Sequence, residues 1–221
     1  AVLAAYAKTN LSAVLLDSAL PDDPWFDRTL DAYFPTQLRE RFADQIQQHP
    51  LRREIIATVV ANDVASRESV NAAAAEVAEK LGPITILVSN AGVLRDKVLW
   101  KMTDEDFDTV IDVHLRGTFT TARAAAVAMK AQGDGGRLIL IGSPAGQYGN
   151  FGQTNYAATK AGMIGLTDAL SAEFADKGIT VNAVAPGYVA TDSNDHSGLL
   201  TVAQGAAVLV RLATLDQDGP T

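Results

Sequence analysis

Three short runs of apolar residues, separated by segments with helical spacing, divide the later part of the chain. The runs span 84–89, 137–142 and 179–184, and each is rich in Val, Ile and Leu. Such runs are typical of strands that are buried on both faces of a parallel sheet. We therefore predict three parallel strands, with those at 84–88 and 137–142 close together and joined by right-handed crossovers.

The segments between these runs predict helices. Ser66 can cap a helix that ends at Gly82. Thr103 and Asp106 have the spacing of a capping box at the start of a long helix. Strands that alternate with helices in this way indicate an α/β domain. Two further helices are predicted over 155–177 and 201–213.

The beginning of the chain has a different pattern. Apolar residues at helical spacing over 2–18 predict a helix, and a second helix is predicted from Pro35, a favourable first-turn residue. Residues 51–62 fit either a buried strand or the continuation of a helix. We expect residues 1–54 to be helical.

The distribution of glycine places a boundary in the same region. All 17 glycines lie between Gly82 and Gly219, although roughly six would be expected before them at an average content of about 7%. We predict a helical segment over 1–62 and a Rossmann-like, doubly wound α/β domain with a parallel sheet over 63–221. In such domains a glycine-rich turn in the first βαβ unit normally binds dinucleotide phosphates. Since no glycine precedes Gly82, this domain is expected to lack that turn.

Composition and charge limit the function. Lys and Arg number 18 against 26 Asp and Glu, which gives a net charge of −8 and disfavours a nucleic-acid partner. The chain has no cysteine, and its three histidines form no metal-ligand pair, so we expect no metal site. No apolar run reaches the length of a membrane span, and we expect a cytoplasmic protein with no membrane partner.

Several segments suited to chemistry follow the predicted strands, where a doubly wound sheet binds its ligand. Asn90-Ala91-Gly92 follows the first run, Ser143 the second and Pro186-Gly187 the third. Tyr156 and Lys160 are four residues apart on the next helix, so they share a face.

This set of side chains is suited to hydride transfer between a carbonyl and an alcohol. The Lys160 ammonium is expected to lower the pKa of Tyr156 from its ordinary value of about 10. Ser143 can donate a hydrogen bond to the substrate oxygen. A Tyr and a Lys at this spacing are usually an ordinary surface pair, but their order after the other segments favours an active site.

Residues 63–192 resemble the short-chain dehydrogenase/reductase family. The resemblance implies that Tyr156 is the general acid/base, that Lys160 tunes it and holds the nicotinamide ribose, and that Ser143 orients the substrate. The matching segments are Asp63-Val64, NAG at 90–92, Ser143, YAATK at 156–160 and PGYVAT at 186–191.

The same resemblance implies a bound NAD or NADP, with the choice between them open. Two groups of residues are expected to contact it. Those on the adenosine side are Asp63, Val64, Asn90, Ala91 and Gly92, and those at the nicotinamide end are Pro186, Gly187, Val189 and Thr191, together with Tyr156 and Lys160.

One catalytic position departs from the family pattern. The family usually has Asn in the middle of the long helix, whereas DVHLRG places His114 there. His114 falls on the inward face, so it is either a satisfied core residue or a catalytic one. VHLRG and YGNFGQTNY resemble the hydroxyacyl-CoA dehydrogenase part of peroxisomal multifunctional enzymes, which accept His here. TNYAATKAGMIGLT is similar to bacterial 3-oxoacyl-carrier-protein reductases, so both resemblances imply 3-oxoacyl or 3-hydroxyacyl thioesters.

Residues 1–62 instead resemble a helical stretch of the large bacterial NAD-specific glutamate dehydrogenases, in AYAKTNLSAVLLDSALPDDPWF and HPLRREIIATVVANDV. The two patterns meet at Asp63-Val64, which suggests a recombined, artificially joined or truncated sequence. Three hypotheses stay open: an NAD(P)-dependent oxidoreductase, a non-catalytic α/β interaction or structural module, and a glutamate dehydrogenase accessory segment. For the first we expect a small carbonyl or alcohol substrate and weak cofactor binding, and a homo-oligomer is compatible with it.

Overall fold

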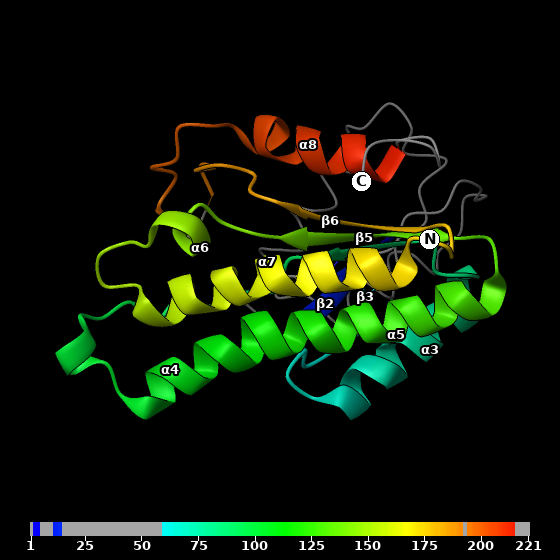
Figure 1. The fold of residues 1–221 in the computed structure, drawn as a ribbon, viewed down its shortest axis with the longest axis horizontal. Helices are drawn as coiled ribbons and strands as arrows, with labels where there is room; N and C mark the ends of the chain where they lie inside the picture. Colours follow the sequence, from blue (N-terminus) through cyan, green and yellow to red (C-terminus); the bar gives the residue numbers. More distant parts are fainter. Residues whose placement is uncertain (1, 5–10, 15–58, 192–193, 215–221) are drawn as a thin grey trace.

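The computed structural model describes residues 2–4, 11–14, 59–191 and 194–214, which build a six-stranded sheet with helices on both faces (Figure 1). The strands are β1 (Val2–Ala4), β2 (Leu11–Val14), β3 (Val59–Ala61), β4 (Ile86–Ser89), β5 (Gly136–Ile141) and β6 (Ile179–Val184). The helices are α3 (Arg67–Leu81), η2 (Leu99–Lys101), α4 (Asp104–Val110), η3 (Ile111–Arg116), α5 (Gly117–Gln132), α6 (Ala145–Tyr148), α7 (Thr154–Phe174) and α8 (Val202–Thr214).

The three strands predicted from the apolar runs are confirmed as β4, β5 and β6. They are parallel neighbours, with Leu87 paired with Leu138 and Leu138 paired with Val181. Ile139 and Leu140 are also buried, so β5 is covered on both faces, as its continuous apolar run indicates. The chain is therefore an α/β protein with parallel strands flanked by helices.

The predicted helix starts are confirmed by their capping contacts. Ser66 Oγ accepts a hydrogen bond from Ser69 N at the start of α3, and Gly82 follows its end. At the start of α4, Thr103 Oγ1 accepts from Asp106 N (3.1 Å) and Asp106 Oδ2 accepts from Thr103 N (3.0 Å). The long helix predicted from this point contains a π-helical turn, η3, which the sequence pattern did not predict. Single π turns within helices are often found at functional sites.

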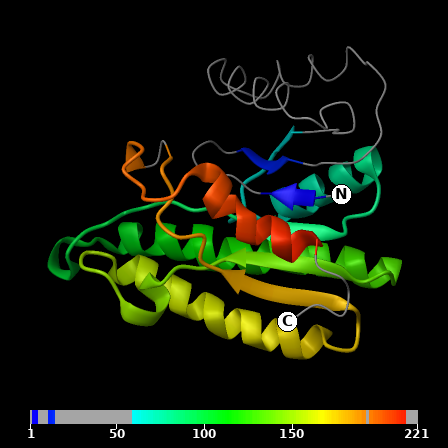
Figure 2. The ribbon, with the colours of Figure 1, turned by 90° about the horizontal axis from the view of Figure 1, so that it is seen from above.

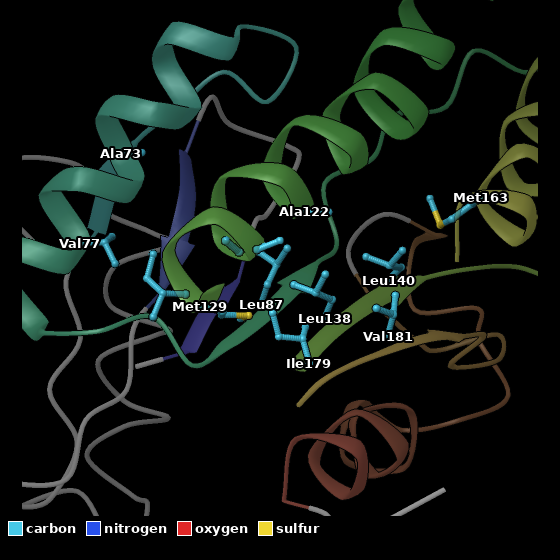
Figure 3. Close-up of a cluster of buried hydrophobic side chains, with 13 residues drawn as sticks. Ala73, Val77, Leu87, Ala122, Met129, Leu138, Leu140, Met163, Ile179 and Val181 are labelled. Carbon is cyan, nitrogen blue, oxygen red and sulfur yellow. The ribbon is translucent and has the colours of Figure 1, made fainter. Parts of the chain in front are cut away.

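Helices cover the two faces of the sheet unequally. α3, α5 and α7 lie on one face and α8 on the other (Figures 1 and 2). Small residues on α5 let it approach the sheet closely, and the core fills the layer between them (Figure 3). The buried cluster comprises Ala73, Val77, Ile84, Leu87, Ala122, Ala125, Ala126, Met129, Leu138, Leu140, Met163, Ile179 and Val181.

The helix predicted over 2–18 is wrong at β1 and β2. β1 pairs in parallel with β4, and β2 pairs antiparallel with β1. Apolar residues at 3, 11 and 14 fit more than one spacing, and the edge of β4 offers backbone hydrogen bonds that override a weak local preference. The strand order, β3-β2-β1-β4-β5-β6, is that of a doubly wound sheet with β2 reversed.

Other expectations for the beginning of the chain are only partly addressed. For residues 51–62 the sequence left a strand and a continued helix open, and the structure has a strand at Val59–Ala61. The helix from Pro35 and residues 5–10, which follow β1 where a phosphate-binding turn would lie, fall outside the described residues. The boundary at residue 62 stays a prediction, although β1–β3 share one sheet with β4–β6. Among the described residues, no helix combines the length and apolarity needed to cross a bilayer.

Candidate active site

The segments that follow β4, β5 and β6 lie at one edge of the sheet, because parallel strands end at the same side. Asn90, Gly142 and Ala185 are the first residues after these strands. Gly142 N donates to Val184 O at 2.8 Å, which keeps the ends of β5 and β6 together. The carboxyl edge that the sequence predicts as the ligand site is therefore present.

Ser143, Tyr156 and Lys160 come together at this edge. Tyr156 lies in the first turn of α7, and the Ser143 side chain is near enough to the Tyr156 hydroxyl to act on the pKa of Tyr156. Lys160 follows one turn later, with Nζ 5.4 Å from the centroid of the Tyr156 ring. Nζ donates to Ile141 O at the end of β5, so the ammonium is tied to the sheet. The structure thus places these three residues as the sequence predicts, and their chemical roles stay predictions.

The expected direction of the Tyr156 pKa is wrong. Burial raises the pKa of Tyr156 above 10, the Ser143 hydrogen bond opposes that rise, and the Asp96 carboxylate adds to it. Lys160 is 4% exposed, and burial lowers its pKa to about 8. Its ammonium faces a backbone carbonyl and lies beside the ring, so desolvation outweighs the attraction that the sequence argument invoked.

His114 lies on the π-helical turn and contacts the Tyr156 ring and the backbone of Val93. Its ring is 5.2 Å from the Tyr156 ring in an edge-to-face arrangement. Nε2 lies 3.0 Å from Val93 N and 2.8 Å from Val93 O. Burial, and secondarily the charge of Lys160, lower its pKa to about 4, so the imidazole is neutral at pH 7. Nδ1 is buried and has no hydrogen-bond partner within the described ranges, so the description of a fully satisfied core histidine does not hold.

Two glycines allow close packing at the site. A Cβ on Gly92 would lie 2.4 Å from His114 Cε1, and a Cβ on Gly146 would lie 2.6 Å from the backbone carbon of Lys160. Side-chain atoms do not occur at such separations, so these two positions need glycine. Gly92 packs against the imidazole ring, and its contact with the cofactor stays a prediction.

The predicted adenosine-side pair lies where β3 leads into α3. Asp63 is exposed and its Oδ1 accepts a hydrogen bond from Ala65 N at 3.0 Å. Val64 is buried, and it packs against Gly117 at the start of α5, where a Cβ would meet Val64 Cγ2 at 2.8 Å. Gly117 is three residues after His114, so the long helix connects this pair to the rest of the site.

The predicted nicotinamide-end residues follow β6 and are tied to the segment before α8. Pro186 is half-buried, Gly187 is exposed, and Val189 pairs with Leu200. Thr191 N donates to Asn194 Oδ1 at 3.0 Å. A Cβ on Gly205 of α8 would lie 2.3 Å from Val189 Cγ2. The segment after β6 that contains Val189 is therefore packed against α8.

A link between two loops was missed by the sequence analysis. Three consecutive residues after the NAG turn are bonded to the residues just before Tyr156, and contacts between such distant positions leave no local signal. The bonds are Asn155 Nδ2 to Arg95 O (3.1 Å), Gln153 Nε2 to Asp96 Oδ2 (2.7 Å) and Lys97 N to Gly152 O (2.8 Å).

Comparison with known proteins identifies the family. The sequence profile described as short chain dehydrogenase matches residues 35–198. The chain belongs to the short-chain dehydrogenase family. The family match begins at residue 35, ahead of the boundary that the glycine distribution predicts.

Several curated relatives of this short-chain dehydrogenase are known. Nodulation protein G of Azospirillum brasilense is 48% identical over 134 residues, which are 61% of this chain and 54% of that protein. A 3-oxoacyl-[acyl-carrier-protein] reductase of Staphylococcus aureus is 44% identical over 133 residues, 60% of this chain and 54% of the relative. The acetoacetyl-CoA reductase of Cupriavidus necator is 43% identical over 154 residues, 70% and 61%. The chain thus spans a little over half the length of these relatives, and the predicted family is confirmed.

Proposed function

We propose that this short-chain dehydrogenase is an NAD(P)-dependent oxidoreductase that interconverts a carbonyl and an alcohol, with a 3-oxoacyl or 3-hydroxyacyl thioester as substrate. The observation that carries the proposal is the position of the Tyr156 hydroxyl beside Ser143 and one turn before the buried Lys160. Two relatives named as 3-oxoacyl-[acyl-carrier-protein] and acetoacetyl-CoA reductases support the thioester.

The residues at the carboxyl edge fit the ribose end of a nicotinamide dinucleotide. An ammonium group has three N–H donors, and the bond that Lys160 makes to Ile141 O uses one of them. A buried cation with further donors suits ribose hydroxyls. Asn90, Ala91 and Pro186 border this edge. In this proposal Asp63 and Val64 would contact the adenosine side, and Gly187, Val189 and Thr191 would contact the nicotinamide end.

A reduced nicotinamide, when bound, supplies the hydride to the carbonyl carbon. Tyr156 donates its hydroxyl proton to the carbonyl oxygen, and Ser143 donates a hydrogen bond that holds this oxygen against Tyr156. Because burial raises the pKa of Tyr156, the hydroxyl is protonated at pH 7, which is the form that donates a proton in carbonyl reduction. Lys160, whose pKa is lowered to about 8, then returns a proton to Tyr156 and recovers one from water before the next turnover.

A second candidate function is a cofactor-deficient α/β module that acts in binding or assembly. The observation that favours it is the lack of any glycine before Gly82, since glycine lets the backbone approach a pyrophosphate. Losing two or three N–H bonds to phosphate, at roughly 1.5–3 kcal/mol each, weakens binding about a hundredfold or more. An ordinary micromolar dissociation constant would rise to about 0.1 mM or higher.

Two measurements test these alternatives. Calorimetry with NADH and NADPH gives the affinity, and a dissociation constant in the low micromolar range would contradict the module. Consumption of reduced cofactor with acetoacetyl-CoA, compared between the chain and its Tyr156→Phe variant, tests the oxidoreductase. Turnover that survives Tyr156→Phe would overturn the proposed role of Tyr156. A cytoplasmic location and a homo-oligomer are part of the same proposal.

A further inference from the structure

The Asn155 side chain joins three parts of the chain immediately before Tyr156. Asn155 is fully buried, and its Nδ2 donates to Arg95 O (3.1 Å) in the loop after β4 and to Asp106 O (3.2 Å) in α4. Its Oδ1 accepts a hydrogen bond from Tyr156 N at 2.8 Å. The amide thus uses both of its N–H donors. Its orientation is fixed, because the nitrogen faces two carbonyls and the oxygen faces an N–H.

The bond to Tyr156 N acts on the turn that carries the reacting hydroxyl. The first N–H groups of a helix have no acceptor within that helix, and Tyr156 is the third residue of α7. The Gln153 side chain, which precedes α7, bonds to Asp96 and does not cap the helix. Asn155 Oδ1 takes up that donor, so one side chain connects the main chain of Tyr156 to the loop after β4 and to α4.

Burial distinguishes these bonds from the other contacts between the two loops. The bond between Asp96 and Gln153 is exposed, so water can take the place of either partner. The Asn155 amide is shielded from water. Its removal would leave the carbonyl oxygens of Arg95 and Asp106 without this donor, which is costly for groups that water does not reach. The first turn of α7 would then move to recover other contacts.

We propose that Asn155 is a positioning residue that sets the place of the Tyr156 hydroxyl relative to Ser143 and the substrate carbonyl. This inference rests on the proposed function. One turn further along α7, the backbone of Lys160 is already packed against Gly146 on the Ser143 side. Asn155 fixes the preceding turn against the loop after β4 and against α4. Because proton donation requires the reacting atoms to lie within hydrogen-bond reach, a displaced first turn slows the transfer.

A positioning role and a purely structural role differ in what the loss of the side chain changes. Asn155 is fully buried, and within the described residues its side-chain hydrogen bonds all go to backbone atoms. It therefore has no access to a substrate or cofactor. Loss of a positioning residue lowers kcat and leaves both KM values nearly unchanged, whereas loss of a structural residue lowers stability and leaves the kcat of the folded chain unchanged.

The first experiment compares Asn155→Ala with Thr167→Val in the reduction of acetoacetyl-CoA. We expect Asn155→Ala to lower kcat about tenfold to a hundredfold, as a displacement of about 1 Å does, with both KM values within about twofold of those of the unaltered chain. Thr167 is also buried in α7, where its Oγ1 donates to Met163 O at 2.8 Å. Thr167→Val removes this bond about three turns beyond Tyr156 and should leave kcat unchanged.

A second variant guards against a failure to fold. Asn155→Ser keeps a polar group that suits the start of a helix, but its single O–H can serve only one of the two carbonyls. It should lower kcat as Asn155→Ala does, with the fraction of folded chain measured by urea unfolding. An unchanged kcat in folded Asn155→Ala, or a loss that lies in KM, contradicts the inference. Failure of both variants to fold would assign Asn155 to the fold alone and would also overturn it.

A last measurement needs no turnover. The Tyr156 ring lies edge-to-face with the His114 ring at 5.2 Å, so its NMR signals respond to a displacement of either ring. With these signals assigned through Tyr156→Phe, we expect Asn155→Ala to shift them and Thr167→Val to leave them in place. Unchanged signals in Asn155→Ala overturn the inference. Shifted signals in a chain whose unaltered form reduces no acetoacetyl-CoA would refute the proposed function and leave the positioning of Tyr156 by Asn155 established.

Discussion

The imidazole ring of His114 fills the space that a side chain on Gly92 would occupy, with Cε1 only 2.4 Å from the position of a Cβ. The ring also bonds to the backbone of Val93. The turn after β4 and the π-helical turn η3 are therefore packed as one unit, and the same ring lies edge-to-face with the Tyr156 ring. A change at either residue is expected to be felt at the other.

Gly92→Ala should destabilise the chain by about 1–3 kcal/mol, the usual cost of overpacking, because the new methyl displaces the imidazole. The same substitution should cost less in a His114→Ala background, where the space is free, so a double-mutant cycle measured by urea unfolding gives a coupling energy. Gly165→Ala is the control: it adds a methyl within α7 where no atom lies within 4 Å, and should stabilise by roughly 0.5–1 kcal/mol. Additive effects at Gly92 and His114 would contradict this packing.

Tyr156→Phe should lower kcat for carbonyl reduction by about 10²–10⁴-fold, the usual contribution of a general acid. Phenylalanine keeps the ring that contacts His114 and loses only the hydroxyl, so the circular dichroism spectrum and the unfolding midpoint should stay close to those of the unaltered chain. A large loss of stability would show that the Ser143 hydrogen bond is structural and would weaken the kinetic interpretation.

Lys160→Met should stabilise the chain at pH 7 while removing activity. Burial lowers the pKa of Lys160 from 10.5 to about 8, so below pH 8 the folded chain bears the full cost of a buried charge, at most roughly 3 kcal/mol. As the pH rises from about 8 to 10.5, the folded lysine loses its proton before the unfolded one, and this cost disappears. The difference in unfolding free energy between variant and unaltered chain should therefore shrink over that range. A difference that is constant with pH would contradict the lowered pKa.

Asp106→Asn should lower the urea midpoint at neutral pH, because the Asp106 carboxylate accepts hydrogen bonds from Lys97 and from Thr103. The Lys97 contact, followed by the Thr103 bonds, holds the pKa of Asp106 well below 3.8. Its contribution is present above the ordinary Asp pKa and is lost as the pH falls through the folded value. The variant should lack that part of the acid-induced loss of stability. Asp104→Asn, in the same first turn, is the matched control.

Local signals explain which parts of the fold could be predicted. Ser66, and the pair Thr103 and Asp106, form caps with neighbours in the sequence, so their patterns were sufficient. The runs that became β4–β6 each span six residues, are rich in Val, Ile and Leu and alternate with helical segments. β1 and β2 are three and four residues long, too short for a spacing to be distinctive, and their pairing partners determine them.

The candidate site also has features that local sequence patterns predicted and features that depend on the tertiary fold. Motif spacing predicted that Ser143, Tyr156 and Lys160 would converge, because the strand ends and the helical turn fix their places. The direction of the Tyr156 pKa was missed because it depends on desolvation, which a sequence does not display. The bond between Asp96 and Gln153 was missed because it joins positions that only the tertiary fold brings together.

The contact between Gly146 and the backbone of Lys160 has a consequence for how the site can open. α6 carries the Ser143 side and α7 the Tyr156 side, and at this contact the two backbones have no room for even one methyl group. The two sides are therefore packed together as one rigid unit. Any residue larger than glycine at position 146 would therefore push the Ser143 side away from the Tyr156 side.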